Sequence, residues 1–158
     1  MPEDYYRRNL PHIEPFERDV FVTFCTYERW IIPKQLRLKV LEHCLHDHQA
    51  KILADCVVVM PDHVHMIFSI LQDEQGIYYP LRHIMQAIKS ASAHSINKLL
   101  KRKGTVWQDE SVDHIIRSDL SIREKSEYVC MNPVRKGLVE SPDDYPWLWR
   151  SWIEGIVK

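Results

Sequence analysis

The stretch ILADCVVVM-PD-HVHMIFSIL, residues 52–71, decides the fold. Residues 52–60 are too apolar for a strand with one face in water, which favours a central strand. Pro61 and Asp62 are typical of a tight turn. In residues 63–71 the apolar side chains at even positions point one way, and positions 63, 65, 67 and 69 point the other. The stretch therefore predicts two strands joined by a turn.

Further elements are predicted on both sides of this stretch. Residues 20–27 (VFVTFCTY) indicate a strand, and residues 34–49 carry an apolar stripe at helical spacing. Residues 80–101 predict a long basic helix, with Ala91 among its inward positions, and residues 111–118 a fourth strand. The order β-α-β-β-α-β is that of the ferredoxin-like (split βαβ) sandwich, an α+β fold with helices on one face of an antiparallel sheet. The other face must be covered by something else or serve as a working surface.

The C-terminal part predicts one more helix and a tryptophan-rich tail. Residues 121–124 (SIRE) have the spacing of a capping box and are expected to open the helix. Pro133 prevents that helix from continuing cleanly past Asn132. The chain has 158 residues and contains no repeat or obvious linker, so we expect a single domain over residues 1–158.

Composition narrows the class of protein. Hydrophobic residues make up 45% and charged residues 27% of the chain, as in ordinary folded proteins. The longest apolar run, residues 57–60, is far short of the about 20 residues that a membrane helix needs. The N-terminus has no apolar signal core, so we expect a cytoplasmic protein without membrane contact. The four scattered cysteines form no CxxC pair and are expected to be buried, reduced thiols.

Charge is distributed unevenly along the chain. The net charge is −1, which by itself argues mildly against nucleic-acid binding. Between Gln75 and Gln108, however, there is no acidic residue. That stretch carries six cations: Arg82, Lys89, Lys98, Lys101, Arg102 and Lys103. They form either a phosphate-binding surface or a solvated helix face.

Two pairs of residues could carry chemistry. His63 and His65 are two residues apart in a predicted strand, so both imidazoles lie on the same face and their Cα atoms are roughly 6.6 Å apart. They are either metal ligands or histidines of the core and surface. Tyr128 and Asn132 are four residues apart on one helix face. Taken alone, the tyrosine is a packing residue or a nucleophile, and the asparagine ends the helix.

The string MPDHVH, residues 60–65, resembles the signature of the single-tyrosine HUH transposases. Within that superfamily the chain most resembles the REP-associated tyrosine transposases, which act on repetitive extragenic palindromic (REP) hairpins. The resemblance extends over nearly the whole chain. Its other motifs are Tyr6–Arg7–Arg8; residues 20–24 with Thr26–Tyr27 and Arg29; Trp107–Gln108 with residues 113–117; Tyr128 with Asn132–Pro133–Val134 and residues 137–139; and Ser141–Pro142 with residues 145–147.

The resemblance implies a role for four residues. His63 and His65 would bind a divalent metal, Asn132 would be a polar third ligand, and Tyr128 would be the nucleophile. The implied product is a 5′-phosphotyrosine with a free 3′-OH, a reversible bond that suits strand transfer. Two imidazoles and a carbonyl oxygen leave open positions for a phosphate and suit Mg²⁺ or Mn²⁺.

The expected partner is single-stranded DNA beside a hairpin, held by phosphate contacts. The candidate DNA-binding residues are Arg7, Arg8, Arg82, Lys89, Lys98, Lys101, Arg102, Lys103, His114 and Arg117. Trp107 either stacks on a base or belongs to the core. A single tyrosine per chain fits a monomer or a homodimer.

Two other functions compete with the transposase hypothesis. Histidine-triad nucleotide hydrolases carry three alternating histidines, but the third place here is Ile67, which excludes them. A ferredoxin-like sheet also occurs in binding modules, so the chain could be a domesticated, non-catalytic hairpin DNA- or RNA-binding protein. A pure binder would not need His63, His65 and Tyr128 together, and their joint presence favours the enzyme.

Overall fold

The computed structural model describes residues 19–116 and 119–153, with the side chains of all of these except residues 119 and 120. Arg7, Arg8 and Arg117, three of the predicted DNA-binding residues, lie outside the described residues.

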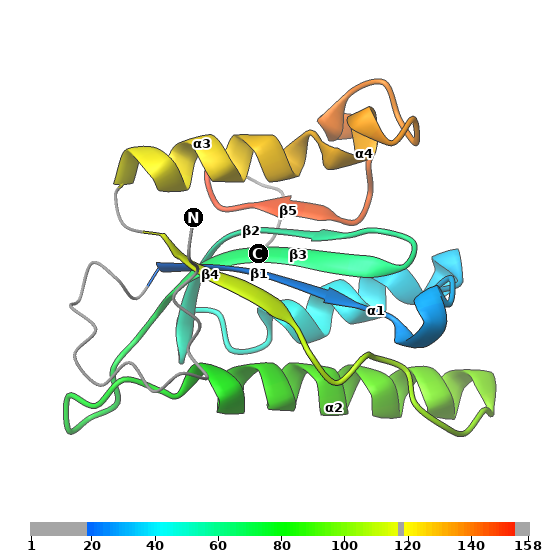
Figure 1. Cartoon of the computed structure of the whole chain (residues 1–158), viewed down its shortest axis with the longest axis horizontal. Helices are drawn as coiled ribbons and strands as arrows, with labels where there is room; N and C mark the ends of the chain where they lie inside the picture. Colours follow the sequence, from blue (N-terminus) through cyan, green and yellow to red (C-terminus); the bar gives the residue numbers. More distant parts are fainter. Residues whose placement is uncertain (1–18, 117–118, 154–158) are drawn as a thin grey trace.

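A five-stranded sheet forms the centre of the molecule (Figure 1). Its strands are β1 (Asp19–Cys25), β2 (Ile52–Val59), β3 (His63–Ile70), β4 (Val112–Ile116) and β5 (Leu148–Arg150). They lie in the order β4-β1-β3-β2-β5, and every neighbouring pair is antiparallel.

Helices cover both faces of this sheet. α1 (Lys34–Leu45) and α2 (Leu81–Leu100) lie on one face, and α3 (Asp119–Cys130) lies on the other (Figure 1). The single-turn helix α4 (Asn132–Arg135) follows α3 directly, and 3₁₀ turns span Tyr27–Arg29 and Pro142–Asp144. The predicted β-α-β-β-α-β order and the ferredoxin-like α+β fold are confirmed. The helices expected on one face are α1 and α2, and the face whose cover was left open is covered by α3, the helix that carries Tyr128.

Strand alternation divides the core between the two faces. On β3, Val64, Met66 and Phe68 are fully buried in the larger cluster with α1 and α2. Ile67 points the other way and packs in a second cluster with Val129 of α3. Each large apolar side chain buried in this way contributes about 1.5–3 kcal/mol. Both layers are therefore held by apolar contacts to the same strand.

The buried side of α2 differs from the prediction at one position. Ala91 is exposed, and Ser92 faces the core instead. The Ser92 hydroxyl donates to the carbonyl of Ile88 and accepts from the indole N–H of Trp107. These two bonds satisfy a polar group that burial would otherwise destabilise.

The C-terminal part also differs from the prediction. α3 includes Asp119, so Ser121 lies inside the helix and the predicted capping box does not open it. α3 ends at Cys130, as expected from Pro133, which sits in the first turn of α4. The tryptophan-rich tail forms β5, which pairs with β2 and makes β2 an interior strand, as its apolar sequence predicts.

None of the helices in the described part of the chain is both long enough and apolar enough to span a membrane. All four cysteines are free thiols; three are buried and Cys25 is partly exposed.

Candidate active site

His63 and His65 lie at the start of β3 and point to the face of the sheet that α3 covers. Alternation along the strand puts both imidazoles on this face, and their ring centroids are 4.8 Å apart. The ring of Phe21, on β1, packs against His65 with a centroid distance of 5.7 Å. The two imidazoles therefore lie close enough together to share one cation.

Each imidazole is held through its Nδ1 atom. His65 Nδ1 lies 2.7 Å from the hydroxyl of Thr23, and His63 Nδ1 lies 2.7 Å from a carboxylate oxygen of Asp62. Arg29 donates to the other oxygen of Asp62 at 3.1 Å. Burial raises the pKa of Asp62, but the hydrogen bonds from Arg29 and His63 outweigh burial and lower it. With Nδ1 engaged on both rings, Nε2 is the atom that each can offer to a metal.

The electrostatic surroundings keep His65 neutral. Burial has the largest effect and lowers the pKa of His65 to about 3, with further lowering from the charges of His63, Arg135 and Lys136. A neutral imidazole is the form that binds a metal. His65 therefore has the protonation state that its predicted role requires.

Tyr128 lies near the end of α3 and its side chain is 62% exposed. The neighbouring Val129 is buried in the second cluster and fixes the helix to the sheet. Tyr128 lines one pocket of about 340 Å³ together with His63, His65 and Asn132. The structure thus brings together, from β3, α3 and α4, the four residues to which the family pattern assigns catalysis and metal binding.

Asn132 begins α4 and is only 6% exposed. Its side-chain oxygen Oδ1 accepts a hydrogen bond from Nη2 of Arg135 at 3.2 Å. An amide oxygen has two lone pairs, so it can keep this bond and still bind a cation.

The donor set suits a divalent metal only if the amide takes part. Within residues 19–116 and 119–153, no three His, Cys, Asp or Glu side chains gather as a metal site. Two anchored imidazoles and one amide oxygen remain, a nitrogen and oxygen set that fits Mn²⁺ or Mg²⁺ with positions left for phosphate oxygens.

Three cations of the pocket were not predicted as site residues: Arg29, Arg135 and Lys136. Arg29 occurs in a family motif and Arg135 follows Pro133 by two residues, but neither position predicts where the side chain points. Thr23 was missed as well, because its contact with His65 depends on the register between β1 and β3. A phosphate in this pocket would meet the positive charge of the cations that line it.

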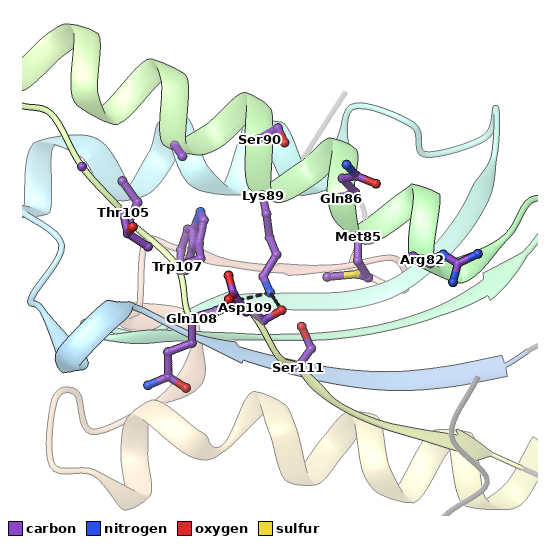
Figure 2. A pocket seen from close by; sticks show the side chains of 13 residues that line it. Arg82, Met85, Gln86, Lys89, Ser90, Thr105, Trp107, Gln108, Asp109 and Ser111 are labelled. Carbon is purple, nitrogen blue, oxygen red and sulfur yellow. Dashed lines mark hydrogen bonds between the residues drawn. The ribbon is translucent and has the colours of Figure 1, made fainter. Parts of the chain in front are cut away.

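Two of the predicted DNA-binding cations bind the protein itself. Figure 2 shows Lys89 reaching from α2 to the backbone, where its Nζ donates to the carbonyls of Gln108 at 2.7 Å and Asp109 at 3.1 Å. Burial, the largest effect, lowers the pKa of Lys89. The guanidinium of Arg102 donates to Asn97 at 2.7 Å and lies 4.6 Å from the centre of the Trp30 ring.

The other predicted cations of this region are exposed: Arg82, Lys98, Lys101 and Lys103. α2 has 20 residues and is therefore about 30 Å long, so Arg82 is far from the group at its C-terminal end. That end of α2, the β2–β3 turn and α4 all lie toward the right of Figure 1. The exposed lysines are thus at the same end of the molecule as the pocket, but beyond the opposite face of the sheet.

The two remaining predicted positions, His114 and Trp107, lie in different parts of the structure. His114, on β4, lies beside Phe21 with ring centroids 6.1 Å apart, on the same face of the sheet as His65. Trp107 is buried and packs edge-on against Phe24 at 4.8 Å, so stacking of Trp107 on a DNA base is wrong and the core alternative is right.

Known proteins with similar sequences support the resemblance. A protein of Haemophilus influenzae, provisionally named a REP-associated tyrosine transposase, is 25% identical over 96 residues, which is 58% of this chain and 54% of the relative. The REP-associated tyrosine transposase of Escherichia coli is 28% identical over 89 residues, or 56% of this chain and 48% of the relative. The matches thus span about half the length of these curated relatives.

The fold also matches a solved structure, that of a REP-associated tyrosine transposase bound to a REP hairpin. The TM-score is 0.66 with 18% identity, over 100% of this chain and 94% of the other. The family described as "Transposase IS200 like" matches residues 20–130. That range contains β1 except for Asp19, then β2 to β4, and α3 with Tyr128. The predicted resemblance is confirmed, and the chain belongs to the IS200-like transposase family.

Proposed function

We propose that this chain cleaves and rejoins single-stranded DNA beside a palindromic hairpin through a covalent bond to Tyr128. The observation that carries the proposal is the pocket that Tyr128 shares with His63 and His65. Its residues include side chains of β1, of β3 and of the adjoining helices α3 and α4, so three segments that are far apart in the sequence meet there. The names of the relatives, REP-associated tyrosine transposases, support the same reaction class. The solved structure with the same fold is bound to a REP hairpin, which supports the hairpin partner.

The reaction is an in-line displacement at phosphorus. The phenol oxygen of Tyr128 attacks the scissile phosphate, the bond from phosphorus to the 3′-oxygen breaks, and a 5′-phosphotyrosine forms. The proton lost by the phenol is balanced by the proton gained by the 3′-oxygen, with solvent as carrier. Attack by a 3′-OH on the phosphotyrosine reverses these changes and rejoins a strand.

The residues of the pocket fit this chemistry. His63 and His65 would hold a divalent metal through Nε2, with Asn132 Oδ1 as a third ligand. When bound, such an ion neutralises charge on the non-bridging phosphate oxygens. Thr23 and Asp62 orient the imidazoles through the Nδ1 contacts of 2.7 Å.

Hairpin binding is the second part of the proposal. The C-terminal end of α2, which carries exposed lysines, and α4, whose Arg135 lines the pocket, lie toward one end of the molecule (Figure 1). A hairpin stem at that end would place a flanking single strand near Tyr128. The recognition would depend on phosphate contacts and shape.

The test uses a labelled oligonucleotide with an inverted repeat that flanks this gene and single-stranded extensions on both sides. With Mn²⁺ the protein should form an adduct that survives denaturing electrophoresis. Tyr128→Phe should form none, because the phenol oxygen is gone, whereas Tyr27→Phe, at another exposed tyrosine, should behave as wild type. An adduct that persists in Tyr128→Phe overturns the assignment of the nucleophile.

His63→Ala separates catalysis from binding. This variant should lose cleavage but keep hairpin affinity, measured by mobility shift. If wild type binds the hairpin and forms no adduct with Mn²⁺ or Mg²⁺, the chain is a binding module and the catalytic proposal fails.

A further inference from the structure

The guanidinium of Arg135 makes three contacts around the proposed nucleophile. Its Nη1 donates to the backbone carbonyl of Tyr128 at 2.8 Å, and its Nη2 donates to Oδ1 of Asn132 at 3.2 Å. Its central carbon lies 3.7 Å from the centre of the Tyr128 ring. The guanidinium therefore lies over the phenol ring while two of its nitrogens bind the polypeptide on either side.

The break between α3 and α4 creates this arrangement. The Tyr128 carbonyl lies in the last turn of α3 and accepts from the backbone N–H of Met131 at 3.2 Å in place of a regular helical bond, so a lone pair is left for a side chain. A new helical turn, α4, begins at Asn132 with Pro133 next to it, and Arg135 is the last of its four residues. The backbone N–H of Arg135 donates to the carbonyl of Met131 at 2.9 Å. This bond fixes the backbone from which the Arg135 side chain extends.

The proposed reaction requires the phenol of Tyr128 to be held in a fixed direction, and the contacts of Arg135 can do this. Tyr128 is 62% exposed, so little of the protein surrounds its ring. A nucleophile must nevertheless stand in line with the phosphorus, and a misplacement of about 1 Å can cost about 100-fold in rate. A planar guanidinium stacked on the ring restricts its rotation, and a lysine ammonium has no plane to do so.

We propose that Arg135 is the positioning residue of Tyr128: it fixes the plane of the phenol and the direction of the Asn132 amide oxygen before DNA binds. The inference rests on the proposed function of Tyr128. The competing role is a direct salt bridge to DNA phosphate. Against that role, two of the three guanidinium nitrogens already bind backbone or side-chain oxygens of the protein.

The experiment compares Arg135→Lys with wild type on the hairpin oligonucleotide. A residue that binds phosphate keeps its charge in Arg135→Lys, whereas a residue that positions the ring no longer has a planar group to stack on it. We expect the rate of adduct formation at saturating DNA to fall about 10- to 100-fold without a comparable change in Kd. The control is Arg123→Lys, which changes a guanidinium on α3 that lies 5.7 Å from the centre of the Trp152 ring, and it should leave the rate unchanged.

A spectroscopic readout tests the inference without DNA or metal. In protein with ¹³C-labelled tyrosine rings, the resonance absent in Tyr128→Phe belongs to Tyr128. It should shift and sharpen in Arg135→Lys as the ring gains mobility, and stay unchanged in Arg123→Lys. A full rate in Arg135→Lys, a reduced rate explained by Kd alone, or an unchanged Tyr128 resonance overturns the inference. If wild type forms no adduct, the proposed function fails, and the resonance still decides whether Arg135 holds the ring.

Discussion

The two faces of the sheet share the same strands but differ in how completely they are closed. Toward α1 and α2, the side chains of β3 are apolar and fully buried, as at Val64, Met66 and Phe68. Toward α3, the same strand presents His63 and His65 at one end, and these line an open pocket. Alternation allows one strand to fix the fold with half of its side chains and to position a site with the other half.

The difference teaches where substitutions should affect stability and where they should affect chemistry. Side chains of the closed face have no contact with the pocket, and their removal leaves a cavity. Ile67 and Val129 are buried on the open face as well, but the side chains around the pocket, such as Phe21, are only partly buried, so their removal costs less stability. Each of the following changes tests or refines this division.

Phe68→Ala should give the largest change in stability. The ring is fully buried between the sheet and its two helices, so we expect a loss of about 3–5 kcal/mol in the free energy of unfolding. Phe21→Ala, on the open face, should cost about 1–2 kcal/mol because its ring is only partly buried. Urea unfolding of both variants measures the difference. Equal losses would show that the two faces are equally important for stability.

Thr23→Val should have the opposite profile, with a large change in activity and a small one in stability. The substitution keeps the volume of the side chain and removes the hydroxyl that lies 2.7 Å from His65 Nδ1. Removing such a partner typically lowers metal affinity or activity about 10- to 100-fold. The measurement is adduct formation against Mn²⁺ concentration. Thr23→Ser keeps a hydroxyl and should retain most of the activity. Wild-type activity in Thr23→Val would exclude this role for the hydroxyl.

The exposed lysines at the end of α2 lie beyond the closed face and should affect only DNA affinity. Replacing Lys98, Lys101 and Lys103 together by alanine should weaken hairpin binding and reduce its dependence on salt. The logarithmic salt slope should decrease by about 0.7–0.9 for each phosphate that a lysine no longer neutralises. Titration of the hairpin at several salt concentrations measures this slope. An unchanged slope means that these lysines form a solvated helix face.

The sequence predicts the fold well because its signals are local. Alternation in residues 63–71 and helical periodicity in residues 80–101 identify the elements and the face to which His63 and His65 point. β5 was missed because its three residues, Leu148–Arg150, become a strand only through pairing with β2. Its identity depends on tertiary structure.

Of the residues in the site, the sequence predicts those that belong to family motifs with an assigned role. The family pattern indicates His63, His65 and Tyr128, and the fold brings them to one pocket. Thr23 lies 42 residues from His65, so its contact depends on strand register, which no local pattern contains. Arg135 reaches the ring of Tyr128 because the helix breaks between them, and the direction of the side chain after such a break cannot be predicted from spacing.

Asp55 lies on the open face and should produce the smallest change, one that depends on pH. It occupies a β-bulge of β2 and lines a second pocket on this face with Asp19 and Arg123. Burial, and then the charge of Asp19, raises the pKa of Asp55 from 3.8 to about 6, while Arg123 lowers it. The folded protein therefore binds this proton more tightly than the unfolded chain does. Stability is highest below pH 4 with respect to this group and decreases as pH rises to about 6.

Asp55→Asn should remove this loss. Because the carboxyl is partly solvated, we expect on the order of 1 kcal/mol between pH 4 and pH 7 rather than the full value of the pKa shift. The variant should equal wild type near pH 4 and exceed it at pH 7, as measured by urea unfolding at both values. Arg123→Ala should act in the opposite direction and make the decrease steeper, because it removes the charge that lowers the pKa of Asp55. If the free energy of unfolding depended on pH in the same way in all three proteins, Asp55 would be solvated as fully as a surface carboxylate. The difference between the two faces would then be limited to the end that holds Tyr128.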